Sequence, residues 1–184
     1  CSKALIIVCC DYVDRGRMTF ETLRLIYALK TYMGERCIML KGNHEIIKYS
    51  FSMLRPTFYP ADTTVLMNRV WKTEVNNLYF NYLLRLPYLI SLKYPGKKYL
   101  ICHGSIPRHD YAAFFNEDKL TELFLPVSDL SDEGIMLNQM LWGDPGDNSS
   151  VFRGSEIRFE FSKTEFLEFM NKQGYDIMIR GHQP

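Results

Sequence analysis

The hydrophobic and polar positions along the chain form two kinds of pattern, one typical of strands and one typical of helices. Residues 4–10 are a continuous apolar run, a pattern typical of a strand buried on both faces, and residues 36–40 (RCIML) are expected to form a second buried strand. Between Thr19 and Met33 the apolar positions recur at helical spacing, and Gly34 follows them. We therefore expect a helix that stops at Gly34, and a further helix after His44.

The second half of the sequence continues this alternation. Residues 55–62 are expected to form a loop, because two prolines interrupt them, and residues 70–86 a long aromatic-rich helix. Two strands, 88–93 and 98–102, are joined by a turn at 94–97. The remaining expected elements are short helices at 117–125 and 132–141, a polar loop at 143–154, a helix from the capping box Ser162–Glu165 to about Gln173, and a last buried strand at 175–179.

This order of elements predicts an α/β domain with a partly parallel sheet and one antiparallel hairpin. The 184 residues suit a single domain, and 47% hydrophobic with 23% charged residues is an ordinary globular composition. A formal net charge of +1 gives no general attraction to nucleic acid or acidic membranes, and no apolar run is long enough to cross a bilayer. We therefore expect neither nucleic acid nor membrane as a partner.

Cysteine usage bears on the cellular compartment. The chain has 5 cysteines, and four of them, Cys9, Cys10, Cys37 and Cys102, lie in short apolar runs, as buried thiols do in a reducing compartment. The sequence opens with Cys1 and shows no signal peptide. We expect a cytoplasmic protein, with the nucleus as a second location, and a chain truncated at both ends.

Metal-competent side chains follow four of the predicted strands. Asp11 follows the first strand, Asn43 and His44 the second, His103 the hairpin, and His182 the last strand. Ligands of α/β sheets bind beyond the carboxyl ends of the strands. Oxygen and imidazole donors suit Mn, Fe or Zn, and two such ions about 3.5–4 Å apart can polarise a phosphate and activate a water. The pattern predicts metal-dependent phosphoester hydrolysis, with Asp11 placed to bridge two ions.

Five short motifs share the order and spacing of one family. They are Asp11–Gly16 (DYVDRG), Gly42–Glu45 (GNHE), His103–Gly104, Trp142–Pro145 (WGDP) and Arg180–Gln183 (RGHQ). Together they resemble the phosphoprotein phosphatase family of serine/threonine phosphatases, which are calcineurin-like metallophosphoesterases. The resemblance implies one catalytic domain over residues 1–184, an α/β fold built as a β-sandwich of mixed sheets flanked by helices. The metal site would lie at the carboxyl ends of the strands.

The resemblance also implies which residues would hold the cofactors. Two metal ions, each Mn, Fe or Zn, would be bridged by Asp11. Asn43, His103 and His182 would be ligands of the second ion. The GDxHG segment that holds the first ion in the family is absent from this sequence.

The same resemblance implies the catalytic roles. His44 would be the general acid that protonates the leaving alkoxide, and Asp14 would orient it. Arg15 and Asn43 would bind the substrate phosphate, together with Arg153, the best match to an arginine expected after WGDP. The implied reaction is hydrolysis of phosphoserine or phosphothreonine in phosphoproteins, with regulatory subunits as further partners. Residues 46–70 look divergent and longer than in common members, so substrate preference is not implied.

Three alternatives stay open at the level of sequence. Cysteine phosphatases use a C-x5-R loop, and this spacing occurs from Cys9 to Arg15 and from Cys102 to Arg108. A protein lacking the first metal site would instead be a pseudophosphatase that binds or scaffolds partners. Relatives with similar motifs hydrolyse nucleotides or dinucleotide polyphosphates. Each histidine taken alone would more simply be a structural residue, so the metal-site hypothesis depends on their joint occurrence.

Overall fold

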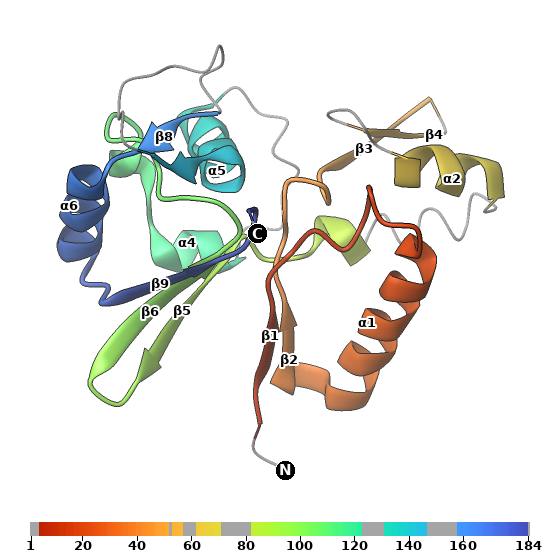
Figure 1. Cartoon of the computed structure of the whole chain (residues 1–184), viewed down its shortest axis with the longest axis horizontal. Coiled ribbons are helices and arrows are strands. Elements are labelled where there is room, and N and C mark those ends of the chain that lie inside the picture. The colour runs from red at the N-terminus through yellow and green to blue at the C-terminus, as the bar shows by residue number, and fades with distance from the viewer. Residues whose placement is uncertain are drawn as a thin grey trace. The chain divides into compact units, whose positions relative to one another are not determined.

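The chain folds as two compact units, Cys1–Leu86 with Phe124–Pro126 and Pro87–Leu123 with Val127–Pro184. Both units combine strands with helices (Figure 1), and the predicted α/β class with mixed sheets is confirmed. The structure, a computed structural model, describes residues 4–51, 53–56, 62–70, 82–122, 131–146 and 158–183.

A parallel strand pair and one long helix begin the first unit. β1 (Ile6–Val8) pairs in parallel with β2 (Cys37–Met39). Between them lie α1 (Thr19–Met33) and the 3-10 helix η1 (Gly34–Arg36). α1 has the predicted bounds and ends where Gly34 takes a φ of 61°. β1 is half-buried and not buried on both faces as predicted, whereas its partner β2, which packs against α1, is largely buried.

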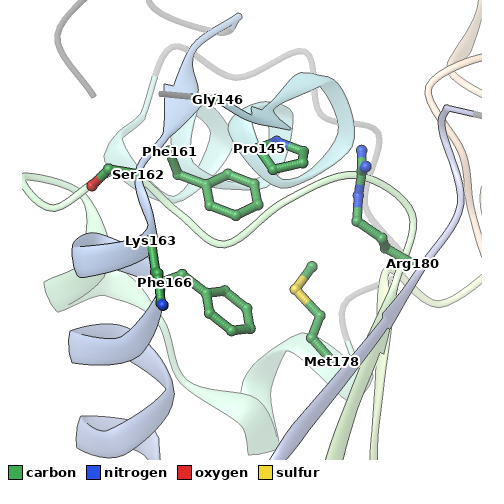
Figure 2. A pocket seen from close by; sticks show the side chains of 8 residues that line it. All are labelled: Pro145, Gly146, Phe161, Ser162, Lys163, Phe166, Met178 and Arg180. Carbon is green, nitrogen blue, oxygen red and sulfur yellow. The ribbon is translucent and has the colours of Figure 1, made fainter. Parts of the chain in front are cut away.

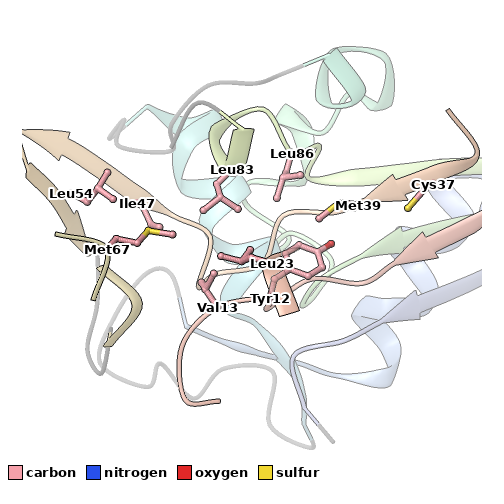
Figure 3. Close-up of a cluster of buried hydrophobic side chains, with 10 residues drawn as sticks. All are labelled: Tyr12, Val13, Leu23, Cys37, Met39, Ile47, Leu54, Met67, Leu83 and Leu86. Atoms are coloured by element: carbon pink, nitrogen blue, oxygen red, sulfur yellow. The ribbon is translucent and has the colours of Figure 1, made fainter. Parts of the chain in front are cut away.

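A hydrophobic cluster forms the core of the first unit (Figure 3). Tyr12 belongs to this cluster, and its hydroxyl lies 2.9 Å from the carbonyl oxygens of both Val8 and Leu40. The core therefore fixes the segment that follows β1, which carries Asp11. The buried members are Tyr12, Val13, Leu23, Cys37, Met39, Ile47, Leu54, Met67, Leu83 and Leu86.

The segment after His44 differs from the prediction. It forms an antiparallel hairpin of β3 (Ile47–Ser50) and β4 (Met53–Pro56), so the helix expected there is wrong. Buried, β-branched Ile46 and Ile47 favour the extended conformation. The register pairs Ile47 with Pro56 at the end of the hairpin, where a proline is tolerated.

The proline-containing loop expected at 55–62 is corrected at both ends. Its first two residues belong to β4, and Asp62 begins α2 (Asp62–Val70), which the sequence analysis did not predict. Hydrogen bonds that Asn68 exchanges with the Leu54 backbone attach α2 to β4. Residues 57–61 lie outside the described residues, as do residues 71–81 of the long predicted helix, of which residues 82–84 are helical.

A three-stranded sheet dominates the second unit. β5 (Leu89–Tyr94) and β6 (Lys97–Cys102) form the predicted hairpin, and β9 (Ile177–Arg180) joins β6 in parallel. The parallel pairing with β6 confirms the mixed sheet. β9 begins two residues later than predicted, and Ile179 is 44% exposed instead of buried, because β9 is an edge strand of this sheet.

Helices of the second unit flank this sheet and largely follow the prediction. α6 (Lys163–Gln173) opens with the predicted capping box, since Ser162 and Glu165 each accept a backbone N–H from the other, and ends at Gly174. None of the described helices combines the length and hydrophobicity that crossing a bilayer requires. The other elements are η2 (Ala112–Phe114), α4 (Glu117–Glu122), α5 (Asp132–Trp142), β7 (Asp144–Pro145) and β8 (Glu160–Phe161), of which β7 falls in the predicted polar loop.

Candidate functional site

Strained backbone conformations mark the segments that follow the strands. Six described non-glycine residues have positive φ, and only Phe51 among them lies away from the predicted site. Such conformations cost roughly 1–3 kcal/mol each and persist where surrounding contacts hold them. The strained residues at the site are Cys10, Asp11, Asp14, Arg15 and His182.

In the first unit, Asp11 lies against the segment Gly42–Glu45. Its Oδ1 accepts the backbone N–H of His44 at 3.4 Å. A Cβ on Gly42 would collide with this oxygen and come within 2.8 Å of the Asp11 backbone nitrogen, so only glycine permits the approach. Asp11 as a residue is exposed, yet partial burial of its carboxyl raises the pKa, and the neighbouring His44 and Arg15 offset this only in part. A bound cation would favour the ionised form.

Glu45 connects the two loops that carry these residues. Its Oε2 accepts the backbone N–H groups of Asp11 at 3.0 Å and Gly42 at 2.8 Å, and its Oε1 accepts that of Tyr12 at 2.7 Å. Burial, together with the charge of Asp11, raises the pKa of Glu45 to about 7. The sequence analysis gave Glu45 no role, although an acidic residue directly before two isoleucines signals a buried carboxyl that needs several donors.

The predicted pair of His44 and Asp14 is in contact. His44 Nδ1 lies 3.0 Å from Asp14 Oδ2, and the two side chains are only 4% and 3% exposed. Burial alone would raise the pKa of the Asp14 carboxyl, but hydrogen bonds from His44 and Thr63 hold it below its usual value. An ionised Asp14 fixes the proton of His44 on Nδ1 and leaves Nε2 as the reactive nitrogen.

Of the three residues expected to bind phosphate, the structure describes two, Arg15 and Asn43. Arg15 is exposed, and its backbone N–H donates to Asp62 Oδ1 at 3.1 Å. Asn43 is buried, with 1% of its surface exposed. Arg153 lies outside the described residues. Their contacts with substrate stay predictions.

In the second unit, His103 and His182 come together at the ends of β6 and β9. His182 Nδ1 lies 3.0 Å from His103 Nε2, and the Gly181 N–H donates to the His103 carbonyl at 2.9 Å. At metal–nitrogen bonds of about 2.1 Å, two nitrogens on one ion would lie about 3.0 Å apart in octahedral and about 3.4 Å apart in tetrahedral coordination. This spacing fits the pair as ligands of one metal ion.

Asp144 and Arg180 form an ion pair beside His182, and neither was predicted as a functional residue. Arg180 Nη2 lies 2.6 Å from Asp144 Oδ1, and its Nε donates to the Gly104 carbonyl. Asp144 Oδ2 lies 3.6 Å from His182 Nε2. A carboxylate near the outer nitrogen of a metal-binding histidine orients the ring. Both residues belong to motifs already noted, WGDP and RGHQ, but their pairing depends on the sheet and cannot be read from spacing.

Arg180 also forms one wall of a cavity of about 640 Å³ (Figure 2). The rings of Phe161 and Phe166 and the side chain of Met178 make its interior apolar. Among the described residues, no carboxylate or imidazole lines this cavity. We assign it no part in metal chemistry.

The cysteines do not support thiol-based catalysis. Burial raises the pKa of the Cys9 thiol, which disfavours the thiolate. Cys102 is 1% exposed, and its thiol donates to the Ser105 carbonyl at 3.6 Å. Cys37 and Cys102 are buried as expected, whereas Cys9 and Cys10 are half-buried because they lie beyond the end of β1.

Comparisons with known proteins bear on the family and the fold. Residues 2–184 match the family model of calcineurin-like phosphoesterases. A solved structure of a protein serine/threonine phosphatase from Saccharomyces cerevisiae, with similarity to human phosphatase PP5, superposes with a TM-score of 0.72. Sequence identity is 19%, so this likeness concerns the fold. The match covers 98% of this chain and 52% of the other, and the chain thus spans about half the length of that phosphatase.

Proposed function

Because the chain belongs to the calcineurin-like phosphoesterase family, we propose that it is a serine/threonine protein phosphatase acting on phosphoprotein substrates. The observation that carries this proposal is the buried His44–Asp14 pair beside Asp11. A serine or threonine alkoxide is a poor leaving group, and its departure needs a proton from a positioned acid. An imidazole held by a carboxylate is suited to that task.

We propose further that Asn43, His103 and His182 would hold one of two metal ions of the Mn, Fe or Zn class, and that Asp11 would be a ligand common to both ions. One carboxylate, one amide and two imidazoles are donors that suit such ions. The 3.0 Å spacing of the two imidazole nitrogens supports this assignment. When bound, the ions activate a water and neutralise charge on the phosphate.

The chain's own groups would divide the remaining work. Asp14 accepts a hydrogen bond from Nδ1–H of protonated His44 and keeps its Nε2–H directed to the leaving oxygen, which takes the Nε2 proton as the P–O bond breaks. Arg15 would bind phosphate oxygens through its planar guanidinium, with Asn43 and Arg153 as further contacts. Regulatory subunits are further partners that we expect.

Replacement of His44 by Asn tests the acid. In the full-length protein loaded with Mn²⁺, we expect kcat on a phosphoserine peptide to fall about 10²–10⁴-fold, the range for loss of a general acid, with metal content retained. His109→Asn is the matched control, because His109 is an exposed histidine in a loop of the other unit. Wild-type turnover by the His44 variant would show that the acid is elsewhere.

Substrate comparison tests the reaction class. A protein phosphatase should hydrolyse phosphoserine and phosphothreonine peptides faster than diadenosine polyphosphate, and the reverse order would favour a nucleotide hydrolase. Chelation should abolish turnover while thiol alkylation spares most of it. A folded, metal-loaded protein without turnover on any of these substrates would be a pseudophosphatase.

A further inference from the structure

The first turn of α2 contacts the loop that carries Asp14 and Arg15. Thr63 is fully buried, and its Oγ1 accepts the backbone N–H of Asp14 at 2.8 Å, while its own N–H donates to Asp14 Oδ1 at 2.9 Å. Asp62 Oδ1 accepts the N–H of Arg15 at 3.1 Å. Three hydrogen bonds thus join segments that lie 47 to 49 residues apart in sequence.

These hydrogen bonds reach the two strained residues of the loop. Asp14 and Arg15 have φ values of 67° and 58°, in the left-handed region that non-glycine residues rarely adopt. Their backbone N–H groups are the ones that Thr63 and Asp62 accept. Two such residues in a row need external contacts to stay in this conformation, and the turn Asp62–Thr63 supplies them.

The same turn also fixes the Asp14 carboxylate. The N–H groups in the first turn of a helix have no partner within the helix, and the positive end of the helix dipole favours an anion there. Asp14 Oδ1 uses one of these groups, that of Thr63, and its Oδ2 lies against His44 Nδ1. Because both carboxylate oxygens are held, the orientation of the imidazole depends on α2.

We propose that Thr63 is a positioning residue, which aims the general acid His44 by holding Asp14 in place. The proposal rests on the proposed function of His44 as the acid. α2 belongs to residues 46–70, where the resemblance to common family members is weakest. The acid pair would therefore be held by a residue outside the motifs that carry the resemblance.

Leaving-group dependence tests this role. Thr63→Val removes the hydroxyl with little change of shape, and Thr63→Ser keeps it. In the full-length protein loaded with Mn²⁺, we expect Thr63→Val to lower kcat on a phosphoserine peptide by about 10- to 100-fold, within the contribution of a general acid. On p-nitrophenyl phosphate, whose leaving group departs without a proton, kcat should change by less than about threefold, and KM should change little on either substrate.

Controls separate positioning from a general structural defect. Thr63→Ser should restore most of the peptide activity, and Thr64→Val, which removes a buried hydroxyl from the same turn, should affect the two substrates alike. Equal losses on both substrates in Thr63→Val, or none on either, would overturn the positioning role. His44→Asn must show the same dependence on leaving group, and its failure to do so would instead count against the proposed function.

Hydrogen exchange provides a measurement that needs no activity. The Asp14 amide should be protected in the metal-free wild-type protein and exchange at least about tenfold faster in Thr63→Val, because its acceptor is lost. An Asp14 amide that exchanges equally fast in both proteins would contradict the contact itself. If wild type fails to hydrolyse the phosphoserine peptide, the proposed function fails, and the exchange result still shows whether Thr63 holds Asp14.

Discussion

Glu45 shows how a single side chain can set the geometry of a site without touching substrate. Its two oxygens accept backbone N–H groups from Asp11, Tyr12 and Gly42. Asp11 and Gly42 are thereby fixed at a distance that only a glycine at position 42 permits. The GNHE motif supplied a candidate acid and one candidate ligand from sequence, whereas the role of its glutamate depends on a second loop that spacing alone does not place.

Replacement of Glu45 by Gln is expected to destabilise the protein. The amide keeps the size of the side chain but turns one acceptor oxygen into a donor, so at least one buried backbone N–H loses its partner. We expect the free energy of unfolding to fall by about 1–3 kcal/mol, measured by urea denaturation of the metal-free protein. The exposed Glu168→Gln is the control and should stay within about 0.5 kcal/mol of wild type.

At the scale of elements, the sequence predicted correctly those helices and strands whose bounds are set by interactions between residues close in sequence. α1 and α6 have strong start and stop signals in sequence, and both were found within a residue of their expected bounds. The β5–β6 hairpin was likewise indicated by its Pro–Gly turn. The β3–β4 hairpin and α2 were missed, because burial of Ile46 and Ile47 and contacts of α2 with Asp14 and Leu54 decide their structure.

The capping box of α6 offers a test at this scale. Ser162→Ala removes the hydroxyl that accepts the Glu165 N–H at 3.2 Å. We expect a loss of about 1 kcal/mol in the free energy of unfolding, the usual effect of losing a helix N-cap. Thr31→Ala in the exposed last turn of α1 serves as the control, because it removes a hydroxyl that donates to the Tyr27 carbonyl within the helix and caps no helix start. Equal effects of the two substitutions would argue against the capping role.

At the scale of the whole molecule, the candidate ligands were predictable because the carboxyl ends of strands gather functional residues. Asp11 and Asn43 belong to one compact unit, and His103 and His182 to the other. The pairing of Asp144 with Arg180 was not predictable, since it joins residues that are distant in sequence through the fold of the second unit.

If the proposed ligands hold metal, metal binding should stabilise the folded protein in a way that depends on each of them. With Mn²⁺ at about 100 times its Kd, we expect about 2.7 kcal/mol of added stability in the full-length protein, seen as a rise in Tm that a chelator reverses. Asp11→Asn and His182→Asn should each lose most of this rise. If either variant kept the full rise, the residue would not be a ligand.

The parallel pairing of β6 with β9 has a consequence for how the protein is made. His103 and His182 are 79 residues apart in sequence, and the strands that present them can pair only after the intervening chain has been synthesised. The β5–β6 hairpin is local and can form early, whereas pairing over such a separation is slow. During translation, His103 is thus synthesised well before His182. A nascent chain on a ribosome stalled before residue 177 would contain His103 but neither β9 nor His182.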